Sequence, residues 1–176
     1  DEIDLALLED QIVINTNDSE LIYPGDIAVF HNEWVLDIFE STKPKCKLYI
    51  SDKLIPGGVL QIREEYVPYT PETADFFLAR FFSERIYIEH PILVTALRVA
   101  NEISEIEGGR KNVFLLGFDF SISNGYTNKI EFANSHDDHE YAERVISSQE
   151  HLLKTIIDEK RRLSINIRHI GSKSYS

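Results

Sequence analysis

The feature that most constrains the fold is the alternation of two patterns along the chain. Short runs rich in Val and Ile alternate with longer stretches whose apolar residues recur at helical spacing. Turn residues such as Pro24-Gly25 separate the short runs, so each run is predicted to be a β-strand. The predicted strands are QIVIN (11–15), DIAVF (26–30), CKLYI (46–50), GVLQI (58–62), RIYIE, NVFLLG (112–117) and SINIRHI (164–170).

The longer stretches are predicted to be helices. Thr70 and Pro71 suit the start of ETADFFLARFF, and Pro91 precedes ILVTALRVANEISEIE. The last stretch, DDHEYAERVISSQEHLLKTIIDEKRR, begins with acids and ends with bases, which suits the helix dipole. Alternating strands and helices predict an α/β fold, an open, mostly parallel Rossmann-like sheet flanked by helices. No long linker divides the chain, so we expect a single domain over residues 1–176.

Composition and charge narrow the partners. The chain of 176 residues carries 18 Lys and Arg against 30 Asp and Glu, a net charge of −12. A surface of that sign repels nucleic acid and anionic membranes, so we expect neither as a partner. No run approaches the roughly 18 apolar residues of a transmembrane segment, and the acidic first residues do not resemble a signal peptide. We therefore expect a cytoplasmic protein.

Two details of composition concern the chain as a whole. No methionine is present, even at the first position, so we expect a fragment of a longer chain. We also expect neighbouring domains or a homo-oligomer as partners. Cys46 is the single cysteine, which excludes an internal disulfide, and its apolar strand predicts a buried packing role. Trp34 is predicted to contact the core or a partner.

Polar residues follow several predicted strands. In open parallel sheets, ligands bind outside the carboxyl ends of the strands, so these residues are candidates for binding or catalysis. A strand-end Asp or Asn can instead form a turn or a cap, and adjacent glutamates can be a solvated edge. The catalytic candidates at strand ends are Glu64, Glu65 and Asp119. The ligand-binding candidates are Asn15, Asn17, Glu89 and His90, with Ser121 and Asn124 in the polar loop after Asp119.

The segment NSHDDHE (134–140) is the most concentrated polar run and precedes the last predicted helix. Its imidazoles, His136 and His139, could act as acid or base because imidazole titrates near neutral pH. The His-x-x-His spacing could also bind a divalent metal, and the segment could simply cap the helix. We favour a protonated His beside a phosphate or leaving group and predict no metal site. The chain has no GxSxG, GxxxxGK[ST] or GxGxxG motif.

Three pieces of the sequence, in order, resemble bacterial sialyltransferases and the related Kdo transferases. These are QIVINTN, then HPILVTALRVANEI followed by NVFLLGFDFS, then the His-containing segment that opens a long helix. The resemblance covers most of residues 11–160. It implies that Asn17 contacts a nucleotide, that Asp119 is the carboxylate of the family's Gly-x-Asp motif, and that His136 or His139 is its downstream His.

The resemblance implies a glycosyltransferase without a cofactor, acting on a CMP-sugar donor. The donor would carry an acidic sugar, Kdo or a sialic-type nonulosonate, and the acceptor would be a surface polysaccharide or lipo-oligosaccharide. Pterin pyrophosphokinase-like proteins share a similar Gly-x-Asp strand, so phosphoryl transfer to a pterin, with a divalent metal at Asp119, is an alternative. A non-catalytic, partner-binding domain is a third reading.

Overall fold

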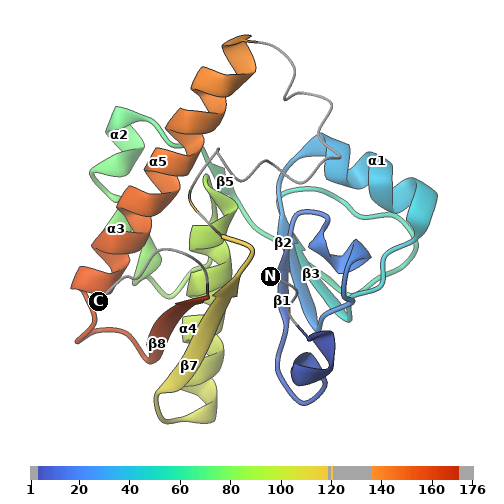
Figure 1. The fold of residues 1–176 in the computed structure, drawn as a ribbon, viewed down its shortest axis with the longest axis horizontal. Helices are drawn as coiled ribbons and strands as arrows, with labels where there is room; N and C mark the ends of the chain where they lie inside the picture. Colours follow the sequence, from blue (N-terminus) through green and yellow to red (C-terminus); the bar gives the residue numbers. More distant parts are fainter. Residues whose placement is uncertain (1–3, 119, 121–135, 171–176) are drawn as a thin grey trace. The chain divides into compact units, whose positions relative to one another are not determined.

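The structure, a computed structural model, describes residues 4–118, 120 and 136–170, with only the backbone described at 136–142 (Figure 1). The chain divides into two compact units, Asp1–Val99 and Ala100–Ser176, which are described separately. The expectation of a single domain stays a prediction.

The first unit is built on a parallel sheet in the order β1-β2-β3-β4. A second ladder pairs β5 with β6, again in parallel. The strands of this unit are β1 (Ile14–Thr16), β2 (Ile27–Phe30), β3 (Leu48–Ser51), β4 (Gln61–Arg63), β5 (Tyr66–Val67) and β6 (Ile88–Glu89). Its helical segments are η1 (Leu5–Leu8), η2 (Ser19–Leu21), α1 (Glu33–Thr42), α2 (Pro71–Ala74), α3 (Phe77–Phe81) and the first half of α4 (Ile92–Glu107).

The second unit contains the remainder of α4, strands β7 (Lys111–Leu116) and β8 (Ile165–Ile170), which pair in parallel, and helix α5 (His136–Asp158). The turn between α4 and β7 is tied to the start of β8. Ser164 donates its N–H to Asn101 Oδ1 at 2.8 Å, and the Ser104 hydroxyl donates to the carbonyls of Gly109 and Ser164. On α5, Leu152, Leu153 and Ile156 are buried.

The predicted fold class is confirmed, since parallel strands flanked by helices form every ladder described. Each predicted strand overlaps an observed one. Two helical details differ from the prediction. The stretch predicted as one helix at ETADFFLARFF is two short helices, α2 and α3, and the Thr73 carbonyl near the break accepts a hydrogen bond from Arg80 Nη1 at 2.9 Å. Helix α1 was not predicted; it buries Val35 and Phe39, one turn apart.

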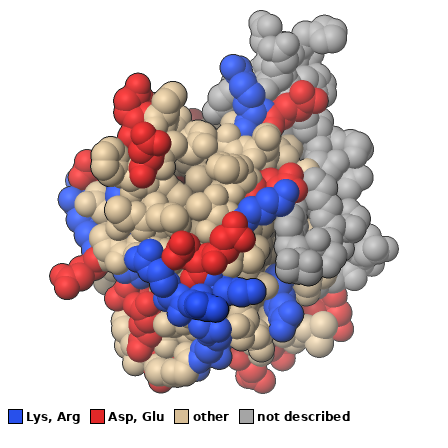
Figure 2. All heavy atoms as spheres, turned by 90° about the vertical axis from the view of Figure 1, so that its left-hand side faces the viewer, with Lys and Arg blue, Asp and Glu red and all other residues tan. Residues whose placement is uncertain are grey.

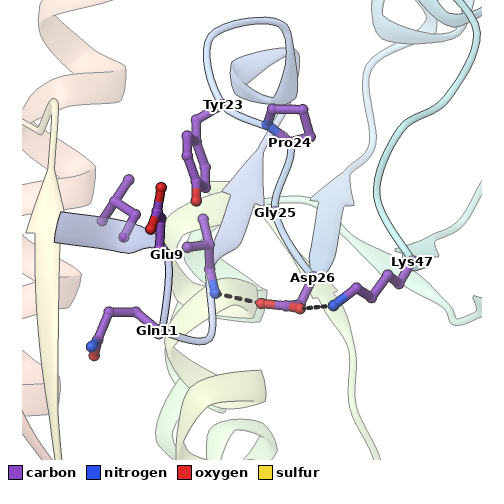
Figure 3. A pocket seen from close by; sticks show the side chains of 9 residues that line it. Glu9, Gln11, Tyr23, Pro24, Gly25, Asp26 and Lys47 are labelled. Atoms are coloured by element: carbon purple, nitrogen blue, oxygen red, sulfur yellow. Dashed lines mark hydrogen bonds and ion pairs between the residues drawn. The ribbon is translucent and has the colours of Figure 1, made fainter. Parts of the chain in front are cut away.

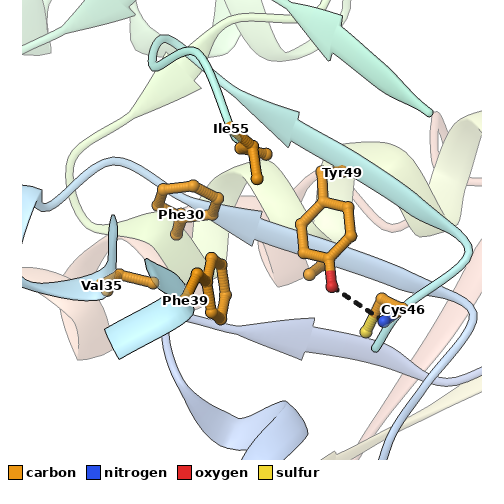
Figure 4. Close-up of a cluster of buried hydrophobic side chains, with 7 residues drawn as sticks. Phe30, Val35, Phe39, Cys46, Tyr49 and Ile55 are labelled. Atoms are coloured by element: carbon orange, nitrogen blue, oxygen red, sulfur yellow. Dashed lines mark hydrogen bonds between the residues drawn. The ribbon is translucent and has the colours of Figure 1, made fainter. Parts of the chain in front are cut away.

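Helix α1 packs with β2 and β3 in an apolar cluster (Figure 4). Phe39 meets Phe30 edge-on, with ring centroids 5.3 Å apart, and meets Tyr49 at 5.6 Å. Trp34 is partly buried against this cluster, so its predicted contact with the core is confirmed. The cluster consists of Ala28, Phe30, Val35, Phe39, Cys46, Tyr49 and Ile55. It fixes β2 and β3, whose carboxyl ends matter below.

A buried polar network lies beside this cluster. Glu20 on η2 is completely buried, and its carboxylate accepts hydrogen bonds from the Tyr49 hydroxyl at 2.6 Å and from the N–H groups of Lys45 and Cys46 at 3.2 Å. The Cys46 thiol donates to Asn15 Oδ1 at 3.4 Å. Burial raises the pKa of that thiol to about 12, so it stays protonated. The predicted packing role of Cys46 is confirmed.

The surface mixes both signs of charge. On the face drawn in Figure 2, Lys and Arg side chains are interspersed with Asp and Glu. Among the residues that the structure describes, no helix is both long and apolar enough to span a lipid bilayer.

Candidate functional site

The carboxyl ends of β2, β3 and β4 lie at one edge of the sheet. The strand register pairs Phe30 with Ser51, and Ser51 with Arg63. The next residues along the chain are therefore neighbours at this edge: His31, Asp52 and Glu64. Parallel sheets bind ligands at such edges, because the chain leaves the strands there and side chains converge outside the core.

His31 is held on several sides. Its imidazole stacks on the Tyr66 ring, with centroids 3.8 Å apart and planes at 6°. The ring of His90, which follows β6, stands edge-on at 6.3 Å. His31 Nδ1 lies 3.8 Å from Asp52 Oδ1. Four side chains from the ends or starts of different strands thus meet; we call His31, Asp52, Tyr66 and His90 the edge cluster.

Asp52 is itself anchored. Its Oδ2 lies 3.3 Å from Lys53 Nζ, which also pairs with Glu33 Oε1 at 2.7 Å. Hydrogen bonding to Glu33, more than the charge of Asp52, raises the pKa of Lys53, so the ammonium persists at neutral pH. The carboxylate of Asp52 is therefore fixed by a cation on one oxygen, while its other oxygen faces His31.

Burial favours the neutral form of both imidazoles of the edge cluster. Burial lowers the pKa of His31 and outweighs the opposing influence of the Asp52 carboxylate. Burial likewise lowers the pKa of His90. Two buried atoms in the cluster, His31 Nδ1 and Asp52 Oδ1, have no hydrogen-bond partner in the described part of the chain. Buried polar atoms are rarely left unpaired, so this gap between them is where a ligand or a tightened contact is expected.

Asn17 and Asn15, both predicted to bind a ligand, have different surroundings. Asn17 follows β1 with a left-handed φ of 53°, which Asn tolerates, and its N–H donates to the Val29 carbonyl at 3.0 Å. Its Oδ1 is buried and lacks a hydrogen-bond partner among the described residues, so it remains a candidate. Asn15 donates to Ser19 Oγ and the Tyr23 carbonyl and accepts from Cys46. Its side chain serves the buried network.

Glu64 and Glu65, predicted as catalytic candidates, are joined to one arginine. Arg85 lies 3.2 Å from Glu64 Oε2 and 3.1 Å from Glu65 Oε2, and its guanidinium also covers the Tyr87 ring. The side chains of Arg85 and Glu65 are 50% and 58% exposed. The arrangement resembles the alternative of a solvated edge, because both glutamates pair with the half-exposed Arg85.

Glu89 and His90, both predicted to bind a ligand, are adjacent in the chain, but their side chains have different partners. Glu89 Oε1 and Oε2 accept from Arg80 Nε at 2.6 Å and Nη2 at 3.0 Å, in a pair whose side chains are 8% and 16% exposed. The Glu89 N–H donates to Thr95 Oγ1 at 2.8 Å. We therefore interpret Glu89 as the residue that fastens α3 to β6, whereas His90 belongs to the edge cluster.

The remaining predicted site residues lie outside the described residues. These are Asp119, Ser121 and Asn124, together with the side chains of His136 and His139, whose backbone forms the start of α5. The residues before and after Asp119 in the sequence, Phe118 and Phe120, are described. The Phe118 carbonyl accepts a hydrogen bond from His169 Nε2, and the Phe120 ring lies 5.6 Å from the His169 ring. The structure therefore leaves these five predictions as predictions.

Sequence reasoning missed His31, Asp52 and Tyr66. His31 and Asp52 satisfy the same strand-end rule that selected Asn17 and His90, since they follow DIAVF and CKLYIS directly. Applying that rule to every predicted strand would have found them. Tyr66 begins a two-residue strand, too short to be recognised by periodicity.

The opposite, amino edge of the sheet carries a shallow hollow of about 140 Å³ (Figure 3). Two of its polar side chains, Asp26 and Lys47, pair with each other. Asp26 accepts from the Val13 N–H at 3.0 Å and from Lys47 Nζ at 2.7 Å, and these contacts lower the pKa of its carboxyl. Both carboxylate oxygens are thus satisfied, and the hollow offers weaker support for chemistry than the edge cluster.

Among the residues whose side chains the structure describes, 4–118, 120 and 143–170, no group of three or more His, Cys, Asp or Glu is arranged to hold a metal ion. The edge cluster can instead move a proton at a neutral imidazole and offer a carboxylate and an aromatic ring to a polar ligand. Comparison of the chain with protein-family models, with curated proteins and with solved structures finds no match.

Proposed function

We propose that the protein is a glycosyltransferase that moves an acidic sugar, Kdo or a sialic-type nonulosonate, from a CMP-sugar to a hydroxyl of a surface polysaccharide or lipo-oligosaccharide. The observation that carries the proposal is the edge cluster: two neutral imidazoles and a carboxylate at the carboxyl edge of a parallel sheet. The order of the sequence motifs described above supports the same reaction class.

The chemistry suits these groups. A sugar leaving from CMP requires a base for the acceptor hydroxyl and stabilisation of the departing phosphate, and it requires no redox cofactor. A neutral imidazole near pH 7 is in the protonation state that a general base needs. Burial supplies that state for both His31 and His90.

A nucleotide partner would satisfy an atom that is otherwise unpaired. Asn17 Oδ1 is a buried acceptor without a donor among the residues described. Leaving such an acceptor unpaired costs about 1–3 kcal/mol. A nucleoside offers O–H and N–H donors, and Asn17 is the residue that the resemblance pairs with the nucleotide.

The proposal is tested by a thermal-shift panel of CMP, CDP, UDP, ATP with Mg²⁺, and a pterin. A ligand that binds only the native state raises the melting temperature, so CMP is expected to raise it most. Asn17→Gly is the matched variant, because glycine keeps the left-handed backbone and removes only the side chain. We expect this variant to melt normally and to lose most of the CMP shift.

Two outcomes would contradict the proposal. The absence of any shift with CMP would remove the donor nucleotide. A shift with ATP, Mg²⁺ and a pterin, but none with CMP, would favour pyrophosphoryl transfer instead.

A further inference from the structure

We propose that His31 is the general base of this transfer and that Asp52 is its positioning residue, an inference that rests on the proposed function. It identifies a catalytic residue that is not part of the Gly-x-Asp or downstream His motif of the sequence. It also selects a reaction course, single displacement with inversion at the anomeric carbon.

The first support is the orientation of the His31 ring. A general base acts efficiently when its ring is fixed before the substrate arrives. Tyr66 stacks on one face of the imidazole at 3.8 Å and is parallel to within 6°, which sets the ring plane. His90 stands across it at 86°. A half-turn about the Cβ–Cγ bond would keep this ring plane, and it would move Nδ1 away from the Asp52 carboxylate, which therefore favours the observed orientation.

The second support is the pair of unpartnered atoms. His31 Nδ1 and Asp52 Oδ1 face each other at 3.8 Å, and neither has a hydrogen-bond partner in the part of the chain that the structure describes. A movement of roughly 1 Å would bring them to the 2.7–3.0 Å of a hydrogen bond. Catalytic hydrogen bonds are often long before substrate binds. With the Nδ1 proton directed at Asp52, the lone pair lies on Nε2.

The third support is that an ion pair holds the Asp52 side chain in its orientation. Lys53 holds its Oδ2 at 3.3 Å, and Glu33 at the start of α1 holds Lys53 at 2.7 Å. A series of charged contacts thus connects the start of α1 to the imidazole, through Glu33, Lys53, Asp52 and His31. Substitution of Asp52 would act on the reaction through His31.

The step is written as follows. Nε2 of His31 takes the proton of the acceptor hydroxyl while that oxygen bonds to the anomeric carbon of the donor. The bond from the anomeric carbon to the phosphate oxygen breaks, and its electron pair leaves with CMP. The resulting imidazolium is stabilised by the Asp52 carboxylate and then releases its proton to water. One displacement of this kind inverts the configuration.

The charges around His31 set where it titrates. Asp52 and Glu33 favour its protonated form, whereas His90, Lys53 and burial oppose it, with burial the largest influence. The uncharged Tyr66 ring contributes to that burial. Removing the Asp52 charge should therefore lower the pKa of His31 further.

The first arm of the test is NMR of the whole chain with ¹⁵N-labelled histidine. The His31 signals are those lost in His31→Gln. We expect the Nδ1–H tautomer for His31 and a fall in its pKa on Asp52→Asn. The Nε2–H tautomer, or an unchanged pKa in Asp52→Asn, would overturn the pairing.

The second arm measures CMP release from CMP-Kdo and CMP-N-acetylneuraminate in the presence of a glycan acceptor. We expect His31→Gln to lower kcat at least about a hundredfold with little change in donor KM. Asp52→Asn should lower kcat at least about tenfold and shift the acidic limb of the pH–rate profile to lower pH. Asp37→Asn, the same change at an exposed position of α1, is the control and should transfer normally.

The outcomes separate the two proposals. If the unmodified protein transfers sugar and His31→Gln does so at the same rate, the base is not His31 while the proposed function stands. If the unmodified protein neither transfers sugar nor binds CMP, the proposed function fails, and His31 as the base of this reaction fails with it. Retained configuration in the product would likewise overturn the single displacement.

Discussion

Replacing Glu89 by Gln exchanges one of the two carboxylate oxygens that hold Arg80 for an amide NH₂ group. The native pair makes two hydrogen bonds, at 2.6 and 3.0 Å, between side chains that are 16% and 8% exposed. In the variant, an N–H donor faces the guanidinium, and a buried positive charge loses its counter-ion. Breaking a buried pair in this way costs about 3–5 kcal/mol. That is a large share of a typical stability of about 5–15 kcal/mol.

The assay is equilibrium unfolding in urea, followed by circular dichroism. With an m-value of about 2 kcal/mol/M, the transition midpoint should fall by about 1.5–2.5 M without a change in slope. The double variant Arg80→Met/Glu89→Met is the control, because apolar replacement of both partners leaves no unpaired charge. We expect it to be more stable than Glu89→Gln, although Thr73 loses the hydrogen bond from Arg80.

A different result would return Glu89 to the ligand-binding role that its position in the sequence suggested. A midpoint within about 0.3 M of the original, less than the change expected from even one lost charged hydrogen bond, would refute the structural reasoning. Loss of CMP binding at unchanged stability would identify Glu89 as a ligand contact.

Three further predictions concern the first unit. Gly25→Ala should destabilise the chain by about 1–3 kcal/mol or more in a denaturant titration, because an added Cβ would lie 2.2 Å from Asn15 Oδ1 and 2.7 Å from the Val13 carbonyl oxygen; a neutral effect would contradict the close approach. Tyr49→Phe should cost about 1–3 kcal/mol by removing the hydroxyl that donates to Glu20, whereas Tyr69→Phe, at an exposed site, should cost nothing measurable. Burial lowers the pKa values of His31 and His90 in the folded state, so below pH 6.5 these residues bind protons more readily in the unfolded chain. The free energy of unfolding should therefore fall as the pH drops from 6.5 through those lowered pKa values. Urea midpoints against pH should fall less steeply in His31→Gln/His90→Gln, and equal slopes would count against the assigned pKa shifts.

The strands could be predicted because their apolar runs are local. DIAVF becomes β2 with only its first residue left out, and its Ala28, Val29 and Phe30 are fully buried. Helix α1 could not be predicted with the same ease, since only Val35 and Phe39 are buried along its ten residues. The division of ETADFFLARFF into two helices could not be predicted from local sequence either, because Arg80 pairs with Glu89, which lies nine residues further along the chain.

The candidate site shows the same limit. The strand-end rule pointed to the edge of the sheet where the edge cluster lies and selected His90 and Asn17, but it gave equal weight to Glu64 and Glu89. Only the structure shows that Arg85 and Arg80 occupy those carboxylates. The stacking of His31 on Tyr66 joins residues 35 positions apart in the chain through strands that do not pair with one another, so no spacing in the sequence could indicate it.

Chemical labelling of the buried Cys46 thiol can measure how often the sheet opens. It is the only cysteine, and with a pKa of about 12 only about one molecule in ten thousand carries the thiolate at pH 8. An alkylating reagent will therefore modify the native protein very slowly and will react mainly when η2 and β3 separate enough to expose the sulfur to water. The labelling rate at one atom then reports how often the sheet opens, and any ligand that steadies this unit should lengthen the time between openings.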